Sequence, residues 1–282
     1  MLIQILNGLV YGTFLFAMAS GLALMFGLRR IVNFAHGALY MLGAYFGYTA
    51  AKLAGFWGGL LVAALGLAVL GVALDILVFR PLRGRDPLTT LLVTFGLALI
   101  SEDFIQTFWG NDTHSFAEPA LLSGVVQLPG TTFPIYRLAI VAFGILVAGG
   151  LAFWLTRSKV GLYVRAASHD PVIAAVQGVD TDRLSALVVG VGAALAGMAG
   201  VVAAPILSIS PAMAADILVD SFIVVVIGGL GSLGGAFAAA LILGQINVLG
   251  VVFLPELTAL LPFLLMMAVL IWRPTGLAGS RV

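Results

Sequence analysis

The chain has 282 residues, of which 62% are hydrophobic and only 9% are charged, with a formal net charge of +1 at pH 7. A soluble domain carries about 25% charged residues, so this composition excludes a protein whose whole surface faces water. The absence of cysteine excludes disulfides, thiolate catalysis and thiolate metal sites. The small net charge and scattered basic residues give no reason to expect a nucleic-acid partner.

Nine apolar stretches are candidates for membrane crossings, because about 20 residues of helix span roughly 30 Å of hydrocarbon. They are residues 2–27, 34–54, 58–79, 88–108, 137–156, 185–206, 213–231, 234–254 and 257–272. The first stretch has no basic leader and no early small-residue cleavage site, so we interpret it as a crossing and not as a cleavable signal. The sequence predicts an all-α polytopic membrane protein of about eight or nine transmembrane helices, with residues 1–282 forming one domain.

Small residues four positions apart predict where helices approach each other closely. They occur at Gly8/Gly12, Gly43/Gly47 and Gly231/Gly235. A glycine-rich segment between the seventh and eighth stretches contains Gly228, Gly229, Gly231 and Gly234. It lacks the lysine of a nucleotide-binding loop, so we interpret it as a tight turn or a close helix crossing. Residues 213–235 either cross the membrane twice or form a re-entrant element, which is tolerated only where protein or a water cavity buries it.

Basic residues set the orientation, because they concentrate in cytosolic loops. With the N-terminus outside and nine crossings, 11 of the 13 Lys and Arg residues are cytosolic, and only Lys52 and Arg137 lie outside. If residues 213–235 are re-entrant, the last helix reverses and the split becomes 9 to 4. We therefore expect the N-terminus outside and the C-terminus in the cytosol.

Two predicted loops are long. The outer loop, residues 109–136, carries acidic residues and prolines but no Lys or Arg. The inner loop, residues 157–184, contains a short apolar run after Asp170 and Pro171, which is the pattern of a capped helix with proline in its first position. Gly178 is a suitable helix stop. A short helix held between two spans by charged flanks is suited to docking on a cytosolic partner.

The segment Val32–Gly37 places an amide, Asn33, and an imidazole, His36, at the start of the second stretch. Polar groups at the edge of hydrocarbon are costly unless they are paired or face a water-lined interior. One interpretation is a helix N-cap by Asn33 with His36 in the first turn. The other places both side chains along a translocation route or its inner gate. His36, His114 and His169 are too far apart in the chain to predict a metal site.

Acidic side chains are expected near the ends of spans and not at their centres. Glu102 and Asp103 lie near the outer end of the fourth stretch, and Asp216 and Asp220 lie near the outer end of the seventh. Asp75 lies one turn from the inner end of the third, where it can snorkel or pair with basic neighbours.

Several motifs follow one another over nearly the whole chain. They are Asn7–Gly12, Gly21–Gly27, Val32–Tyr45, Arg80–Arg83, Thr94–Gly96, Gly161 with Arg165-Ala166 and Asp170, Gly178–Asp180, Gly228–Ala236 and Arg273–Leu277. In these motifs the chain resembles the permease subunits of branched-chain amino-acid (Liv-type) ABC importers. It begins directly at the first motif, as in the shorter, H-type permease, and departs from the family's pattern at Glu102-Asp103.

The resemblance implies an ABC importer permease in the bacterial inner membrane. It implies a pore formed with a second, related permease, a periplasmic binding protein that delivers substrate, and two cytosolic ATPase subunits that bind ATP, so that this chain needs no cofactor. It assigns the inner loop to coupling with the ATPase, through Gly161, Arg165, Ala166, Asp170 and Gly178. We infer from the best-matched motif a substrate pathway that includes Asn33, His36, Gly37 and Tyr40.

The predicted function is the inward transport of branched-chain or other amino acids, or of related small amides, driven by the partner ATPases. An alternative is an ATP-independent secondary transporter or channel, which needs an ionisable coupling site deep in the bundle. A membrane-embedded enzyme needs a nucleophile–base pair or a metal constellation. The sequence displays neither feature.

Overall fold

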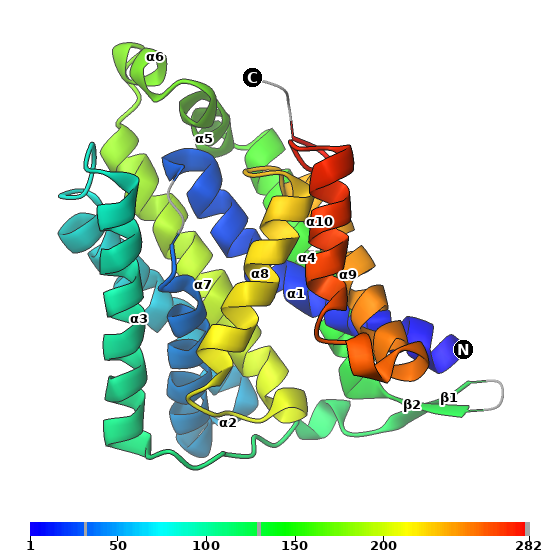
Figure 1. Ribbon diagram of the computed structural model, residues 1–282. Coiled ribbons are helices and arrows are strands. Elements are labelled where there is room, and N and C mark those ends of the chain that lie inside the picture. The colour runs from blue at the N-terminus through cyan, green and yellow to red at the C-terminus, as the bar shows by residue number, and fades with distance from the viewer. Residues whose placement is uncertain (31–32, 129–130, 280–282) are drawn as a thin grey trace.

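The computed structural model describes residues 1–30, 33–128 and 131–279 (Figure 1). The long helices are α1 (Leu2–Arg29), α2 (His36–Leu74), α3 (Pro87–Trp109), α4 (Ile135–Arg157), α7 (Thr181–Leu207), α8 (Met213–Gly228), α9 (Leu233–Phe253) and α10 (Leu261–Trp272). Shorter elements are the π-helical turn η1 (Asp75–Phe79), η2 (Ala120–Leu122), α5 (Lys159–His169), α6 (Pro171–Val176) and η3 (Pro255–Leu257). The predicted all-α membrane class is confirmed.

Six helical segments of the described chain are long and apolar enough to cross a membrane: α1, α2 with η1, α3, α4, α7 and α9. This is fewer than the eight or nine predicted, because α8 has 16 residues and α10 has 12, and because two predicted stretches join in α2. Gly55 interrupts α2 with φ 69° and ψ −179°. A Cβ on Gly59 would lie 3.2 Å from the carbonyl carbon of Gly47, so residues 36–54 and 56–74 fold back on each other.

Glycines bring the central helices together as the small-residue pairs predict. α1 and α7 are buried over most of their length, whereas most of the apolar stretch of α2, α3, α4 and α9 is not. A Cβ on Gly43 of α2 would lie 2.8 Å from the carbonyl oxygen of Gly197 on α7, and a Cβ on Gly12 of α1 would lie 2.8 Å from that of Ala240 on α9. Such contacts replace the hydrophobic driving force that helices lack inside a lipid bilayer.

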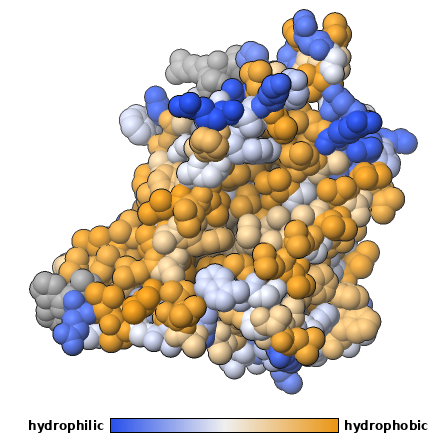
Figure 2. Space-filling model, turned by 180° about the vertical axis from the view of Figure 1, so that it is seen from behind, coloured by the Kyte–Doolittle hydropathy of each residue, from blue (hydrophilic) through white to orange (hydrophobic). Residues whose placement is uncertain are grey.

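The two ends of the bundle differ in character. α5, α6 and the segment that follows α10 lie at one end, and the fold-back of α2 lies at the other (Figure 1). The outer loop contains an element that the sequence did not predict, an antiparallel hairpin of β1 (Val125–Leu128) and β2 (Thr131–Pro134). From behind, the molecule shows a broad hydrophobic band with hydrophilic residues gathered above it (Figure 2). This distribution suits a protein surrounded by lipid.

Candidate functional site

The start of α2 is buried against α1. His36 is the first residue of the helix, and its Nε2 lies 3.0 Å from the carbonyl oxygen of Met18 in α1. The N-cap position belongs to Ala35, so the interpretation of Asn33 as the N-cap, one of the two left open, is wrong. Asn33 instead stabilises the preceding turn: its Oδ1 accepts a hydrogen bond of 3.0 Å from the backbone N–H of Ala35, and its carbonyl oxygen accepts one of 3.2 Å from that of His36.

Gly37 and Tyr40 continue this buried face of α2. A Cβ on Gly37 would lie 2.9 Å from the Cβ of Leu218 on α8, and the ring of Tyr40 lies 6.1 Å from that of Phe14 on α1. The Tyr40 hydroxyl and the Nδ1 of His36 have no hydrogen-bond partner among the described residues. The structure thus brings the four predicted pathway residues together at the junction of α1, α2 and α8, in the packed interior of this chain.

The inner loop forms two helices, of which the sequence predicted only the second. In α6, Asp170 Oδ1 accepts hydrogen bonds of 2.9 Å from the backbone N–H groups of Val172 and Ile173, and Pro171 occupies the first position. Gly178 follows with φ 86°, so the predicted cap and stop are confirmed. α6 exposes Val172, Ile173 and Val176, an apolar surface at the end of the bundle.

The helix that the sequence missed, α5, holds the remaining predicted coupling residues. Gly161 lies against the carbonyl oxygens of Trp154 and Leu155 of α4, where a side chain has no space. Arg165 and Ala166 are exposed on the same helix. The residue that could have indicated the start of α5 is Ser158, since serine is a favoured N-cap residue. Its hydroxyl accepts a hydrogen bond of 2.9 Å from the backbone N–H of Gly161.

The glycine-rich segment is a tight turn between α8 and α9, as predicted. Gly229 and Gly231 have φ values of 97° and 84°, a region that favours glycine, and Gly228 lies against Gly235. The chain after α10 covers this turn, since the backbone N–H of Leu277 donates to the carbonyl oxygen of Ile227 at 2.8 Å. Gly234 has open space around it.

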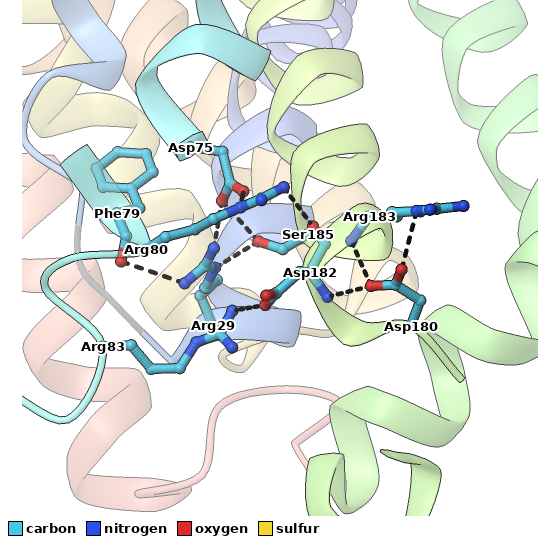
Figure 3. A network of polar contacts seen from close by, with 9 residues as sticks. All are labelled: Arg29, Asp75, Phe79, Arg80, Arg83, Asp180, Asp182, Arg183 and Ser185. Carbon is cyan, nitrogen blue, oxygen red and sulfur yellow. Dashed lines mark hydrogen bonds and ion pairs between the residues drawn. The ribbon is translucent and has the colours of Figure 1, made fainter. Parts of the chain in front are cut away.

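A buried ion cluster joins the ends of α1 and α2 to the first turns of α7 (Figure 3). Asp75, the first residue of η1, is fully buried and pairs with Arg29 at the end of α1 and, at 3.3 Å, with Arg80. Its Oδ1 accepts a hydrogen bond of 2.7 Å from the hydroxyl of Ser185 on α7. The predicted pairing of Asp75 with basic residues is confirmed, but snorkelling is wrong. The sequence missed Arg29 and Ser185 because they are 46 and 110 positions away.

More ion pairs lie at the start of α7, which follows α6 directly. Arg83 pairs with Asp182, and Arg183 pairs with Asp180 at 2.9 Å. Asp180 caps α7 and accepts hydrogen bonds from the backbone N–H groups of Arg183 and Asp182 at 3.0 and 3.1 Å. Chiefly because of the bond from Arg183, the pKa of Asp180 is held below its ordinary value.

Asp220 lies at the eighth of the 16 positions of α8, and its Oδ2 accepts a hydrogen bond of 2.7 Å from the hydroxyl of Tyr11. The expectation that acidic residues avoid the centres of spans is therefore wrong for Asp220. Asp216 lies in the first turn of α8, as expected. An ionisable side chain in the middle of an apolar helix is costly to bury unless it has a partner, and Tyr11 supplies one.

A helical bundle with a broad hydrophobic band and six helical segments long enough to cross a membrane, counted over the described residues, has the architecture of a multi-pass membrane protein. Comparison with known proteins agrees: the chain belongs to the family described as "Branched-chain amino acid transport system / permease component", which matches residues 4–270. The resemblance drawn from the sequence motifs is thereby confirmed.

Similar proteins cover the chain almost completely. It is 29% identical to the high-affinity branched-chain amino acid transport system permease protein BraD of Pseudomonas aeruginosa, over 98% of this chain and 95% of the relative. It is also 29% identical to the permease protein LivH of Escherichia coli strain K12, with 98% and 94% covered. Identity to a probable LivH of Methanocaldococcus jannaschii is 26%, with 98% and 92% covered. No solved structure matches the chain.

Proposed function

We propose that this chain is the membrane-embedded subunit of an ABC importer that carries branched-chain amino acids, or chemically related amino acids and small amides, into the cell. The observation that carries the proposal is the family match over residues 4–270. The names of the relatives supply the substrate class.

The proposed complex contains a second related permease, two cytosolic ATPase subunits and a periplasmic binding protein. α6 enters a groove of the ATPase. Three features support this role: a firmly capped helix, exposed apolar side chains on it, and a short connection to α7. Gly161, Arg165 and Ala166 on α5, with Asp170 and Gly178 around α6, form the rest of this coupling segment.

The proposed topology has nine crossings, with the N-terminus outside and the C-terminus in the cytosol of a bacterial cell. The two halves of α2 then count separately, and α8 and α10 complete the set although they are short. The 11 to 2 division of basic residues supports this arrangement. The position of α5, α6 and the segment that follows α10 at one end of the bundle also supports it (Figure 1).

The proposed substrate pathway passes the buried face of α2 that carries Asn33, His36, Gly37 and Tyr40. This face packs on α8 in the described structure, so it becomes accessible when α2 and α8 move apart. Alternating access requires two such arrangements with different contacts. The unpartnered His36 Nδ1 and Tyr40 hydroxyl supply polar groups to a substrate once the face opens.

The test is uptake of radiolabelled leucine by vesicles that contain the whole complex. Uptake is expected only with ATP on the ATPase side and binding protein on the other. Val172→Glu on α6 is expected to abolish co-purification of the ATPase and uptake together. Val125→Glu is the matched control, because Val125 is 60% exposed and Val172 is 71% exposed, but Val125 lies in the outer loop.

Leucine uptake by this chain without any ATPase subunit would overturn the proposal. The secondary-transporter alternative would then hold, and the Tyr11–Asp220 pair is the observation that favours it. In that case Asp220→Asn would abolish ion-driven uptake, since coupling in such carriers depends on intramembrane ionisable groups.

A further inference from the structure

The buried ion cluster satisfies each of its charged groups. The three guanidinium nitrogens of Arg29 donate to Asp75 Oδ1, to the Ser185 hydroxyl and, at 3.3 Å, to the carbonyl oxygen of Phe79. The Arg29 side chain is 9% exposed and that of Asp75 is fully buried. A buried ion pair contributes little net stability compared with apolar packing, and its best-attested use is to specify one arrangement of the groups around it. Net stability therefore does not explain why these charged residues are buried here.

The π-helical turn shapes the cluster. Within η1 the backbone N–H of Arg80 donates to the carbonyl oxygen of Asp75 at 2.9 Å, five residues earlier. The carbonyl oxygen of Phe79, near the end of the same turn, accepts the hydrogen bond from Arg29. Single π-helical turns inside longer helices are frequent at functional sites. Here the turn holds both the carboxylate and a carbonyl oxygen toward the end of α1.

The cluster is tied to α6 through a short and rigid connection. The backbone N–H of Val179 donates to the carbonyl oxygen of Ala174 in α6 at 3.0 Å, and Asp180 then caps α7. One turn further, Asp182 pairs with Arg83 and its carbonyl oxygen accepts a hydrogen bond from Arg80 at 3.2 Å. Displacement of α6 thus reaches the first turns of α7, which contact both Arg29 and Asp75 through Ser185.

We propose that Arg29, Asp75 and Ser185 form a rigid connection, called the joint below, between the inner ends of α1, α2 and α7. Movement of α6 then displaces these three helix ends together. This inference rests on the proposed function. Apolar surfaces and small residues, which make up most other contacts between these helices, have little directional preference. Charge-assisted hydrogen bonds do, and the fork of an arginine fixes three partners at once. The three residues are positioning residues, since they act on the pathway through the helices that they join.

The first test measures ATP hydrolysis and leucine uptake together in vesicles that contain the whole complex. Asp75→Asn is expected to leave ATPase co-purification intact and to raise the ATP consumed per leucine about tenfold, within the range of ordinary coupling between sites. Arg29→Lys keeps the charge but loses the fork, so a smaller rise is expected. The matched control is Arg183→Ala, which breaks an exposed ion pair at the same end of α7 and should leave the ratio unchanged.

The second test measures a distance. The chain has no cysteine, so no native cysteine has to be removed before spin labelling. The labels are attached to two introduced cysteines, Leu77→Cys on η1 and Arg183→Cys on α7. Both positions are exposed. The label-to-label distance is expected to stay constant between nucleotide-free and ATP-bound complexes, and to differ between these states when Asp75→Asn is added. A purely stabilising cluster would not produce that difference.

The outcomes separate the two proposals. Uptake by the native chain without ATPase would refute the importer function itself. ATP-driven uptake in the native complex, with an unchanged ATP-to-leucine ratio and an unchanged label distance in Asp75→Asn, would refute only the joint. If Asp75→Asn fails to fold, Ser185→Ala decides: it removes one bridging hydroxyl and keeps every charge, and an unchanged ratio in that variant would also refute the joint.

Discussion

Replacing Gly43 with alanine is expected to disrupt the contact between α2 and α7. The new Cβ would lie 2.8 Å from the carbonyl oxygen and 2.9 Å from the carbonyl carbon of Gly197, and closer still to its Cα. Ordinary contacts of a Cβ begin at 3.4 Å, so the two helices must move apart to admit the methyl group. All of these neighbours are backbone atoms, so no side-chain rotation relieves the clash. Overpacking of this kind costs about 1–3 kcal/mol.

Gly66→Ala is the matched control, because Gly66 lies on the same helix and has no atom within 4 Å of the added Cβ. Alanine favours a helix over glycine by about 0.5–1 kcal/mol, so this variant should be neutral or slightly stabilised. The free energy of unfolding is measured by titration with a denaturing detergent in mixed micelles. If Gly43→Ala unfolds at the same detergent fraction as Gly66→Ala, backbone contact does not hold α2 to α7.

Four further outcomes are expected. Asp170→Ala removes both capping bonds of α6 at a cost of about 0.5–2 kcal/mol, and ATPase co-purification should weaken. Gly229→Ala forces a side chain onto φ 97°, costing about 1–3 kcal/mol and lowering the midpoint of thermal unfolding. Tyr11→Phe leaves Asp220 without its hydroxyl donor, costing about 1–3 kcal/mol by the same measurement. The pKa of Asp180 is lower in the folded state, so its stabilisation is complete above its ordinary pKa and is lost as the pH falls through the lowered one; Asp180→Asn should remove that part of the acid dependence.

Local signals in the sequence predicted the local features of the inner loop. The cap of α6 by Asp170 and its stop at Gly178 follow from residues adjacent in the chain, and so does the turn at Gly229 and Gly231. α5 was missed because its mixed polar and apolar composition carries no membrane signal. The fold-back of α2 was predicted as two stretches, since Gly55 interrupts an otherwise continuous apolar run.

Contacts between segments far apart in the chain could not be predicted from the sequence. Asp75 was recognised as an acid near a span end with basic neighbours, but nothing local indicates that Arg29 and Ser185 meet it. Likewise, the predicted stretch 213–231 begins where α8 does, but Asp220 lies two turns inside the helix and not at its end, and nothing local indicates that it meets Tyr11. In an almost uniformly apolar chain, hydropathy locates the spans but does not determine which faces of them meet.

Because the chain is almost uniformly apolar, its few buried charged residues indicate where contacts between helices are specific. Glycine contacts such as Gly43 with Gly197 set how closely α2 and α7 pack, whereas the bond between Asp75 and Ser185 fixes how the ends of the two helices are aligned. Arg29 and Asp75 do not allow sliding, because separating them leaves two charges in a low-dielectric interior. A permease that alternates between two states needs both kinds of contact. On the proposed mechanism, the ends of α1, α2 and α7 that Arg29, Asp75 and Ser185 connect move together between the two states.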